Sequence, residues 1–464
     1  MKAYRLKIWE QTLKELQNLV FADLPKEAGA FALAGFAEHR NGIDIIVRRP
    51  VAIPKDQFSI QHELRLEIST QAINGLIALC ECNKLGAVLC HSHPDDIPYS
   101  PSDDHGERRI FEVLRQFIPP NAPTASLLFY PGGVRGRVWI PNSTNPIPLS
   151  EIIVIGSHLK RIRLNPAQTP VQEDSETIFD RQIRAFGKAG QTMISSTKVG
   201  IVGVGGTGSP TAEQLVRMGV RDLMLIDPDD FDPSNLTRVY GTFASASMRR
   251  TWWRFWKGTK KVAFVAAHLR RINTKTIIQA IPASIVSKAA AHKLLDRDIL
   301  FLCTDNHWSR SIINQIAYQY LIPTINLGMR IDASDGRISD ARGAVDVLRP
   351  GLPCLWCTHF LRAERIAAES MPMRDRLALG REGYVEGLDD PAPSVVSMTT
   401  TISGTGVTIF LQLVTNFMGA GGDIARLNFN LMDGTVRRGR ATVMNECVCK
   451  KTLGFGDLKP LPIL

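Results

Sequence analysis

Two histidines and two aspartates lie close together in the first third of the chain. His91 and His93 precede Pro94, and Asp103 and Asp104 follow after a short polar stretch. A catalytic zinc site needs three protein ligands and one open position, and imidazole and carboxylate groups suit that ion. Zinc lowers the pKa of a water molecule to about 7, and a separate carboxylate must then move the water's proton. The pattern allows a hydrolytic zinc site where the apolar run GAVLC ends, provided that the chain bends near Pro94. Spacing alone does not decide this, because His-x-His with a nearby Asp also occurs on surfaces by chance.

These residues resemble the signature of the JAB/MPN (JAMM) zinc metalloproteases, which cleave peptide or isopeptide bonds after ubiquitin-like C-termini. The resemblance implies that Glu27, within PKEAGAF, is the general base and that His91 and His93 bind catalytic zinc. It also implies that the hydroxyl of Ser100 supports the developing oxyanion. A degenerate domain that keeps this fold without catalysis is the alternative.

The third zinc ligand is ambiguous in the sequence. The family's spacing from the second histidine would select Asp104, whereas the Ser-x-x-Asp pattern selects Asp103. We expect Asp103 to be the ligand, which requires a loop that is one residue shorter than usual.

A glycine-rich turn suggests a second site. The apolar run KVGIV leads into this turn and a helical stretch follows it; the turn contains Gly203, Gly205, Gly206 and Gly208. Glycines let the backbone approach a phosphate, and a helix N-terminus adds partial positive charge. A second apolar run ends at Asp227, where an acidic residue suits ribose hydroxyls. These features predict a nucleotide site at the edge of a parallel sheet.

The segments around this turn resemble the ThiF/MoeB and ubiquitin-activating adenylyltransferases. The resemblance rests, besides the glycine turn, on the ordered segments FDRQI, DPDDFDPSNLTR, GTKKV and LCTDN. These enzymes form an acyl-adenylate and pyrophosphate from ATP and a C-terminal carboxylate. By this resemblance Asp227 holds the ribose, Asn235 a phosphate or the metal shell, and Asp305 holds Mg²⁺. The cations around the triphosphate are Arg181, Arg238 and Lys261.

Four of the eight cysteines form two close pairs, Cys354 with Cys357 and Cys447 with Cys449. The adenylating family often carries a structural zinc held by two such pairs, and four thiolates make a closed tetrahedral site. The second pair is Cys-x-Cys, which is tighter than the usual Cys-x-x-Cys, and two pairs of core cysteines are the alternative. Segment 387–407, where thioester-forming relatives place a cysteine, has none. We therefore expect adenylation without an essential thioester on this chain.

The elements that must position these residues divide the chain in two. Short β-like and helical runs alternate through residues 1–163, which suggests an α/β or α+β domain with a central sheet. The resemblance implies an α/β domain of the JAB/MPN type. Residues 164–176 are polar and carry two prolines, which indicates a linker. From 177 to 464 the order of strand, glycine turn, helix and strand is typical of a Rossmann-like, doubly wound parallel sheet.

The composition is ordinary for a soluble protein, with 44% hydrophobic and 22% charged residues. We expect a cytoplasmic protein that neither spans nor binds a membrane, because no apolar run is long enough for a bilayer and no signal peptide is evident. The net charge is +10, and part of it lies in the Trp-rich segment 248–261. Such a segment could bind nucleic acid or an acidic partner, but we favour a partly docked loop with solvated cations.

The two resemblances together imply a bifunctional enzyme of ubiquitin-like protein conjugation. A zinc peptidase would process or remove a ubiquitin-like protein, and the second domain would adenylate its Gly-type C-terminus with ATP and Mg²⁺. The fusion suggests a bacterial conjugation or antiphage system. Adenylating domains of this family are commonly dimers, so we expect a homodimer. The acyl group would pass to a conjugating enzyme with an acceptor cysteine or to a sulfur donor. The alternatives are a sulfur-carrier or peptide adenylyltransferase of cofactor or natural-product metabolism, and a non-catalytic binding protein.

Overall fold

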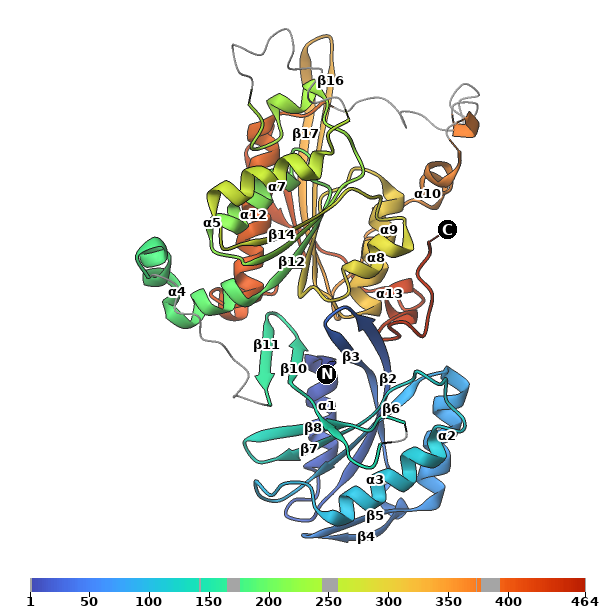
Figure 1. Ribbon diagram of the computed structural model, residues 1–464. Coiled ribbons are helices and arrows are strands. Elements are labelled where there is room, and N and C mark those ends of the chain that lie inside the picture. Colours follow the sequence, from blue (N-terminus) through green and yellow to red (C-terminus); the bar gives the residue numbers. More distant parts are fainter. Residues whose placement is uncertain are drawn as a thin grey trace. The chain divides into compact units, whose positions relative to one another are not determined.

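The computed structural model describes residues 2–141, 143–164, 176–243, 258–372, 374–376 and 393–463. The chain divides into two compact units (Figure 1). Unit 1 contains Met1–Val171, Gln319–Leu321 and Thr452–Pro460, and unit 2 contains Gln172–Tyr318, Ile322–Lys451 and Leu461–Leu464. Unit 1 therefore includes two short segments that a linear division of the chain assigns to the second domain. Most of the expected linker, and residues 248–257 of the Trp-rich segment, lie outside the described residues.

Unit 1 is built on a nine-stranded sheet of order β11-β10-β1-β3-β2-β6-β7-β8-β9, and a separate hairpin forms from β4 and β5. Three helices accompany the large sheet: α1 (Glu10–Val20), α2 (Thr70–Asn83) and α3 (Pro101–Leu114). The strands are β1 (Ala3–Trp9), β2 (Gly29–His39), β3 (Gly42–Ala52), β4 (Phe58–His62), β5 (Arg65–Ile68), β6 (Gly86–Ser92), β7 (Thr124–Tyr130), β8 (Gly133–Val138), β9 (Ile147–Pro148), β10 (Glu151–Ile155) and β11 (Leu159–Arg163).

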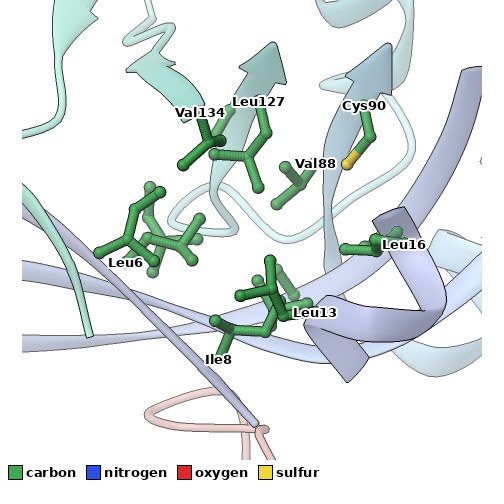
Figure 2. Close-up of a cluster of buried hydrophobic side chains, with 14 of the residues drawn as sticks. Leu6, Ile8, Leu13, Leu16, Val88, Cys90, Leu127 and Val134 are labelled. Atoms are coloured by element: carbon green, nitrogen blue, oxygen red, sulfur yellow. The ribbon is translucent and has the colours of Figure 1, made fainter. Parts of the chain in front are cut away.

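Alternating side chains of the central strands fill two separate cores, as the two-residue period of a strand requires. In β2, Ala30 and Ala32 belong to one cluster, whereas Phe31 and Leu33 belong to the other. Figure 2 shows the first cluster, in which Leu13 and Leu16 of α1 meet Leu6 and Ile8 of β1, Val88 and Cys90 of β6, Leu127 and Val134. The second cluster joins the opposite face of the sheet to α2 and α3. The sheet is thus covered on both faces.

Unit 2 contains an eight-stranded sheet of order β14-β13-β12-β15-β16-β17-β18-β19. Its strands are β12 (Lys198–Val202), β13 (Asp222–Ile226), β14 (Ile277–Ile281), β15 (Ile299–Leu302), β16 (Thr324–Ser334), β17 (Arg337–Leu348), β18 (Arg426–Asn430) and β19 (Thr435–Arg438). Its helices include α4 (Glu176–Ser196), α5 (Gly208–Arg217), α7 (Lys261–Ile272), α8 (Lys288–Lys293), α9 (His307–Gln319), α10 (Ala363–Ser370), α12 (Val396–Thr415) and α13 (Val448–Lys451).

The sheet of unit 2 is only partly parallel. Five neighbouring strands pair in parallel, in the order β14, β13, β12, β15 and β16. Strands β17, β18 and β19 then continue the sheet with antiparallel pairing. The reversal occurs at Asp335 and Gly336, which both have positive φ, as the two central residues of a type I′ hairpin turn require. Figure 1 shows α5, α7 and α12 on one side of the strands and α8 and α9 on the other. The predicted doubly wound arrangement is therefore found, with a mixed rather than fully parallel sheet.

None of the helices within the described ranges is long and apolar enough to cross a membrane.

Candidate functional site

The strand register of unit 1 brings the first set of predicted residues together. Antiparallel pairing of β2 with β6 places Gly29 opposite His91. Because side chains alternate along a strand, His91 lies on the same face as Leu89 of the cluster beneath α2 and α3. Glu27 lies two residues before Gly29, and its backbone N–H donates to the carbonyl of His62. The sheet therefore points Glu27 and His91 toward the face that carries α3.

Nitrogen and oxygen donors of His91, His93 and Asp103 all lie within 4.8 Å of one another. The Nε2 atom of His91 is 3.6 Å from Oδ1 of Asp103, and that of His93 is 3.7 Å from Oδ2 of the same carboxylate. The Nε2 atom of His91 is buried and makes no hydrogen bond within the described residues. An orphaned buried nitrogen beside a second imidazole and a carboxylate fits the donor set of a catalytic zinc.

The two candidate aspartates are neighbours in the first turn of α3, but their side chains contact different residues. Ser100 is the N-cap of this helix, and its side chain forms a capping box with Asp103. The hydroxyl of Ser100 donates to Oδ2 of Asp103 at 2.8 Å. Asp104 instead pairs with Arg137. The structure thus brings Asp103 and not Asp104 to the histidines, while the Ser100 hydroxyl, expected to support an oxyanion, contacts Asp103.

Glu27 lies beside this cluster and is almost fully buried, with 5% of its surface exposed. Its Oε1 atom is 3.5 Å from Nε2 of His93. Burial and the nearby charge of Asp103 raise the pKa of Glu27 to about 7. A carboxyl group with this pKa can accept and release a proton near neutrality, as a general base must.

A pocket opens beside Glu27 and His93. The β4–β5 hairpin supplies one wall, including Leu64, which is 79% exposed. The loop after His93 and the start of α3 supply the other wall, and the full lining is Glu27, Leu64, Arg65, Leu66, His93, Pro94, Ile97, Ser100, Ser102 and Asp103. Glu27, His93 and Asp103 are therefore reachable from solvent past apolar side chains.

The second set of predicted residues meets at the carboxyl edge of the unit 2 sheet. Strand β12 pairs in parallel with β13 and β15, so the segments that follow these three strands share one edge. Gly203 has φ +89°, and a Cβ on it would lie 2.7 Å from the carbonyl oxygen of Cys303. A Cβ on Gly208 would overlap the carbonyl oxygen of Gly203. Both positions thus need glycine for the turn itself, whereas a Cβ on Gly205 would meet no heavy atom within 4 Å.

Asp227 follows β13 and holds the glycine turn through its carboxylate. Its Oδ2 accepts from the backbone N–H of Val204 at 2.8 Å. Lys261 lies 3.6 Å from Oδ1 of Asp227 and donates to Asp229 at 2.8 Å. Burial raises the pKa of Asp227, although the charge of Lys261 opposes this shift. The arrangement leaves an acid and a cation beside the turn, as a nucleotide site requires.

The other predicted residues of this site differ in their surroundings. Asn235 is 4% exposed, and its Oδ1 atom, like Nε of Arg238, is buried without a hydrogen-bond partner in the described chain. Asp305 follows β15 and is exposed. Arg181 is exposed on α4, and among the described residues no hydrogen bond or ion pair links it to Asp227 or Lys261. The structure therefore brings Gly203, Gly208, Asp227 and Lys261 into one constellation, but not Arg181.

Comparison with known proteins decides the family of unit 2. The model of the ThiF family matches residues 179–449. The chain belongs to the ThiF family. Three curated relatives are similar to parts of it. Ubiquitin-like modifier-activating enzyme 5 of Drosophila sechellia is 30% identical over 203 residues, covering 41% of this chain and 44% of that protein. SAMP-activating enzyme E1 of Haloferax volcanii is 27% identical over 172 residues, covering 37% and 56%.

The third relative is adenylyltransferase and sulfurtransferase MOCS3 of Sus scrofa, 32% identical over 155 residues, covering 32% of this chain and 31% of that protein. The chain thus spans between 31% and 56% of the length of these relatives. Among solved structures, that of E. coli MccB with ATP covers 60% of this chain and 75% of its own, with a TM-score of 0.45 and 16% identity.

The ThiF unit also contains a cluster of four buried cysteines. The donor sulfurs of Cys354, Cys357, Cys447 and Cys449 all lie within 4.8 Å of one another. The Sγ of Cys354 is 3.4 Å from that of Cys447, and the Sγ of Cys357 is 3.7 Å from that of Cys449. Hydrogen bonding to Cys449 lowers the pKa of Cys354, and the same contact raises the pKa of Cys449, so the cluster favours one ionised thiol; thiolate is the form that binds metal. The cluster fits a closed tetrahedral zinc site, despite the tighter second pair.

Two residues near Asp305 were not predicted from the sequence. Arg310, in α9, is 6% exposed, and its Nε donates to the carbonyl of Thr304, next to Asp305, at 3.0 Å. Glu369, in α10, accepts the backbone N–H groups of His307 and Trp308 at the start of α9. Both residues hold the segment that carries Asp305. A charged residue in a helix usually faces solvent, so no local signal marks either one.

Proposed function

We propose that unit 2 adenylates the C-terminal carboxylate of a ubiquitin-like or sulfur-carrier protein. The observation that carries this proposal is ThiF membership over residues 179–449, together with a glycine turn held by Asp227 beside Lys261. The similarity to a ubiquitin-like modifier-activating enzyme and to an adenylyltransferase and sulfurtransferase supports this class of substrate.

In this proposal a carboxylate oxygen of the partner's C-terminus attacks the α-phosphorus of ATP. The bond between that phosphorus and the bridging oxygen breaks, and the products are an acyl-adenylate and pyrophosphate. Lys261 and Arg238 would neutralise phosphate charge, and Asp227 would accept from the ribose hydroxyls. Asp305 would hold Mg²⁺, which prefers carboxylate oxygen. Gly205, where a side chain would meet open space, would let the backbone approach a phosphate.

We also propose that unit 1 hydrolyses the peptide or isopeptide bond after such a C-terminus. The convergence of His91, His93 and Asp103 beside Glu27 supports it. Zinc held by these three ligands would supply Lewis acidity and lower the pKa of the attacking water. Glu27 would take a proton from that water and return it to the leaving amine. Leu64, Leu66 and Ile97, which line the pocket, would receive an extended tail.

The cysteines favour transfer of the activated acyl group to a partner. Four form the buried cluster, and Cys80 and Cys90 are buried in unit 1. Desolvation raises the pKa of the half-buried Cys303 thiol, which disfavours its nucleophilic thiolate form at neutral pH. Cys82, the remaining cysteine, is exposed on α2 of unit 1. A cysteine of a conjugating enzyme or a sulfur donor would then accept the acyl group, and a sulfur-carrier function fits as well as conjugation.

A pair of variants tests the two activities separately in the full-length protein. Glu27→Gln should abolish cleavage of a ubiquitin-like fusion while leaving ATP–pyrophosphate exchange unchanged. Asp305→Ala should do the reverse. If each variant lost both activities, the proposal of two independent sites would be wrong. Cross-linking of the purified protein by itself tests the expected homodimer.

A further inference from the structure

Arg137, near the end of β8, is a buried cation at the centre of the polar network behind the zinc ligands. It is 7% exposed, and its guanidinium contacts residues from several segments. Nη2 lies 2.9 Å from Oε2 of Glu107, and Nη1 donates to Asp104. Both carboxylates belong to α3, the helix that carries Asp103. One strand residue therefore holds this helix at two successive turns.

The same guanidinium also reaches the loop between the zinc ligands. Its carbon lies 3.6 Å from the centre of the Tyr99 ring. That ring packs edge to face against His91, with 5.8 Å between ring centres. Oε2 of Glu107 further accepts from Ser126 of β7 at 2.8 Å and from the indole of Trp139 at 2.6 Å. Arg137 is thus connected both to the helix of Asp103 and to the aromatic neighbour of His91.

We propose that Arg137 is a positioning residue of the metal site, which withdraws Asp104 and leaves Asp103 as the aspartate that faces the histidines. The inference rests on the proposed zinc chemistry of unit 1. Adjacent residues of a helix point about 100° apart, so a small rotation of the first turn of α3 would bring Asp104 toward the site. With its charge paired to Arg137, Asp104 cannot compete with Asp103 for a cation. Positioning partners of this kind are worth roughly 10–100-fold in metal affinity.

Cobalt binding to the full-length protein provides the test, because the absorption of bound Co²⁺ reports its ligand set. Subtracting the spectrum of the His93→Ala variant isolates the site in unit 1 from the cysteine cluster. Zinc affinity at the same site is measured by competition with a chromophoric chelator. The variants are Arg137→Met, the conservative Arg137→Lys, and Arg137→Met combined with Asp104→Asn. Arg5→Met, which disrupts a different arginine–aspartate pair in unit 1, is the matched control.

We expect Arg137→Met to weaken zinc binding by roughly 10–100-fold and to change the cobalt spectrum. Adding Asp104→Asn should restore much of the affinity, because the competing carboxylate is removed. Arg137→Lys should bind more tightly than Arg137→Met, and Arg5→Met should keep the wild-type spectrum even if it is less stable.

The inference is overturned if Arg137→Met binds zinc as the wild type does, or if Asp104→Asn restores nothing. If Arg137→Met does not fold, Arg137→Lys decides: wild-type affinity and spectrum together would contradict the proposed role. A wild-type protein without a cobalt signal that depends on His93 would instead overturn the proposed zinc function itself. The two failures are therefore distinguishable.

Discussion

Asp44 shows how a single buried carboxylate stays charged in unit 1. Its side chain is fully buried, yet Arg5 donates to it at 2.7 Å and Lys7 lies 2.9 Å away. The Nε2 atom of His39 lies at 3.2 Å. Burial favours the neutral form, but the charges of Lys7 and Arg5 outweigh it and hold the pKa of Asp44 well below its usual value. The ionised carboxylate therefore stabilises the folded state.

Replacement of Asp44 by asparagine should destabilise unit 1 by ~3–5 kcal/mol at pH 7, because it leaves buried cations without their counter-charge. The folded-state pKa is lowered, so the stabilisation is present above the unfolded value of 3.8 and is lost as the pH falls through the folded pKa. Urea unfolding at several pH values measures this. Below about pH 4 the free energy of unfolding should depend less on pH in the variant than in the wild type. An equally steep decrease of this free energy in both proteins would contradict the assignment.

Substitution by alanine should affect stability at one glycine of the turn and ATP binding at another. Gly208→Ala forces a methyl group onto the carbonyl of Gly203 and should cost about 1–3 kcal/mol of stability. The methyl group of Gly205→Ala would have no heavy atom within 4 Å, so the melting temperature should not change. The same methyl group should weaken ATP binding, because it would keep a phosphate from approaching the backbone. Thermal unfolding and ATP–pyrophosphate exchange separate the two effects. Unchanged exchange in folded Gly205→Ala would place the phosphate elsewhere.

At the scale of elements, the cysteine cluster joins parts of unit 2 that are too short to be stable alone. Helix α13 has four residues, and its Cys449 meets a turn that contains Cys354 and Cys357. A helix of this length is not stable by itself, so its position depends on tertiary links. The backbone N–H of Leu355 also donates to Asn314 of α9 at 2.9 Å. Metal at this cluster would tie α13 to the rest of the ThiF unit.

Cys354→Ser should therefore lower the zinc content of the purified protein and destabilise unit 2 by at least about 3 kcal/mol. Metal analysis and thermal unfolding, with and without a strong chelator, measure both effects. Cys82→Ser, at an exposed position on α2, is the control and should change neither quantity. A Cys354→Ser protein with wild-type zinc content would show that the four thiols are only core residues.

At the scale of the whole molecule, unit 1 is completed by residues from the far end of the chain. Gly456 forms a bridge with Phe36 of β2, and the backbone N–H of Glu38 donates to Asp457 at 2.8 Å. Arg48 lies over the ring of Phe455, 4.3 Å from its centre. Phe455 and Leu458 also pack against the core beneath α2 and α3. Segment 452–460 is therefore part of the fold of unit 1.

Truncation after Lys451 should destabilise unit 1, although it removes only the C-terminus. Phe455 and Leu458 are partly buried, so losing both should cost at most roughly 1.5–3 kcal/mol each. Hydrogen exchange should become faster at amides of β2 and β3, while truncation after Pro460 should leave their protection unchanged. Equal protection in both truncated proteins would show that the segment contributes nothing to the stability of unit 1.

The local features of this protein could be predicted from its sequence. The glycine turn after KVGIV, the acidic end of β13 and the paired cysteines depend on residues close together in the chain, where spacing limits geometry. Membership of the ThiF family and the two-unit organisation follow the same local patterns. The zinc ligands and the catalytic roles remain predictions, although the structure brings Glu27, His91, His93 and Asp103 together.

The identity of the aspartate that faces the histidines emerged only from the fold, in which Asp104 pairs with Arg137 of a distant strand. The fold also revealed the burial of Arg310 and the docking of segment 452–460 on unit 1. These features arise from packing between residues far apart in sequence. Periodicity and motif spacing carry no information about such contacts, since each partner is locally compatible with an ordinary exposed position.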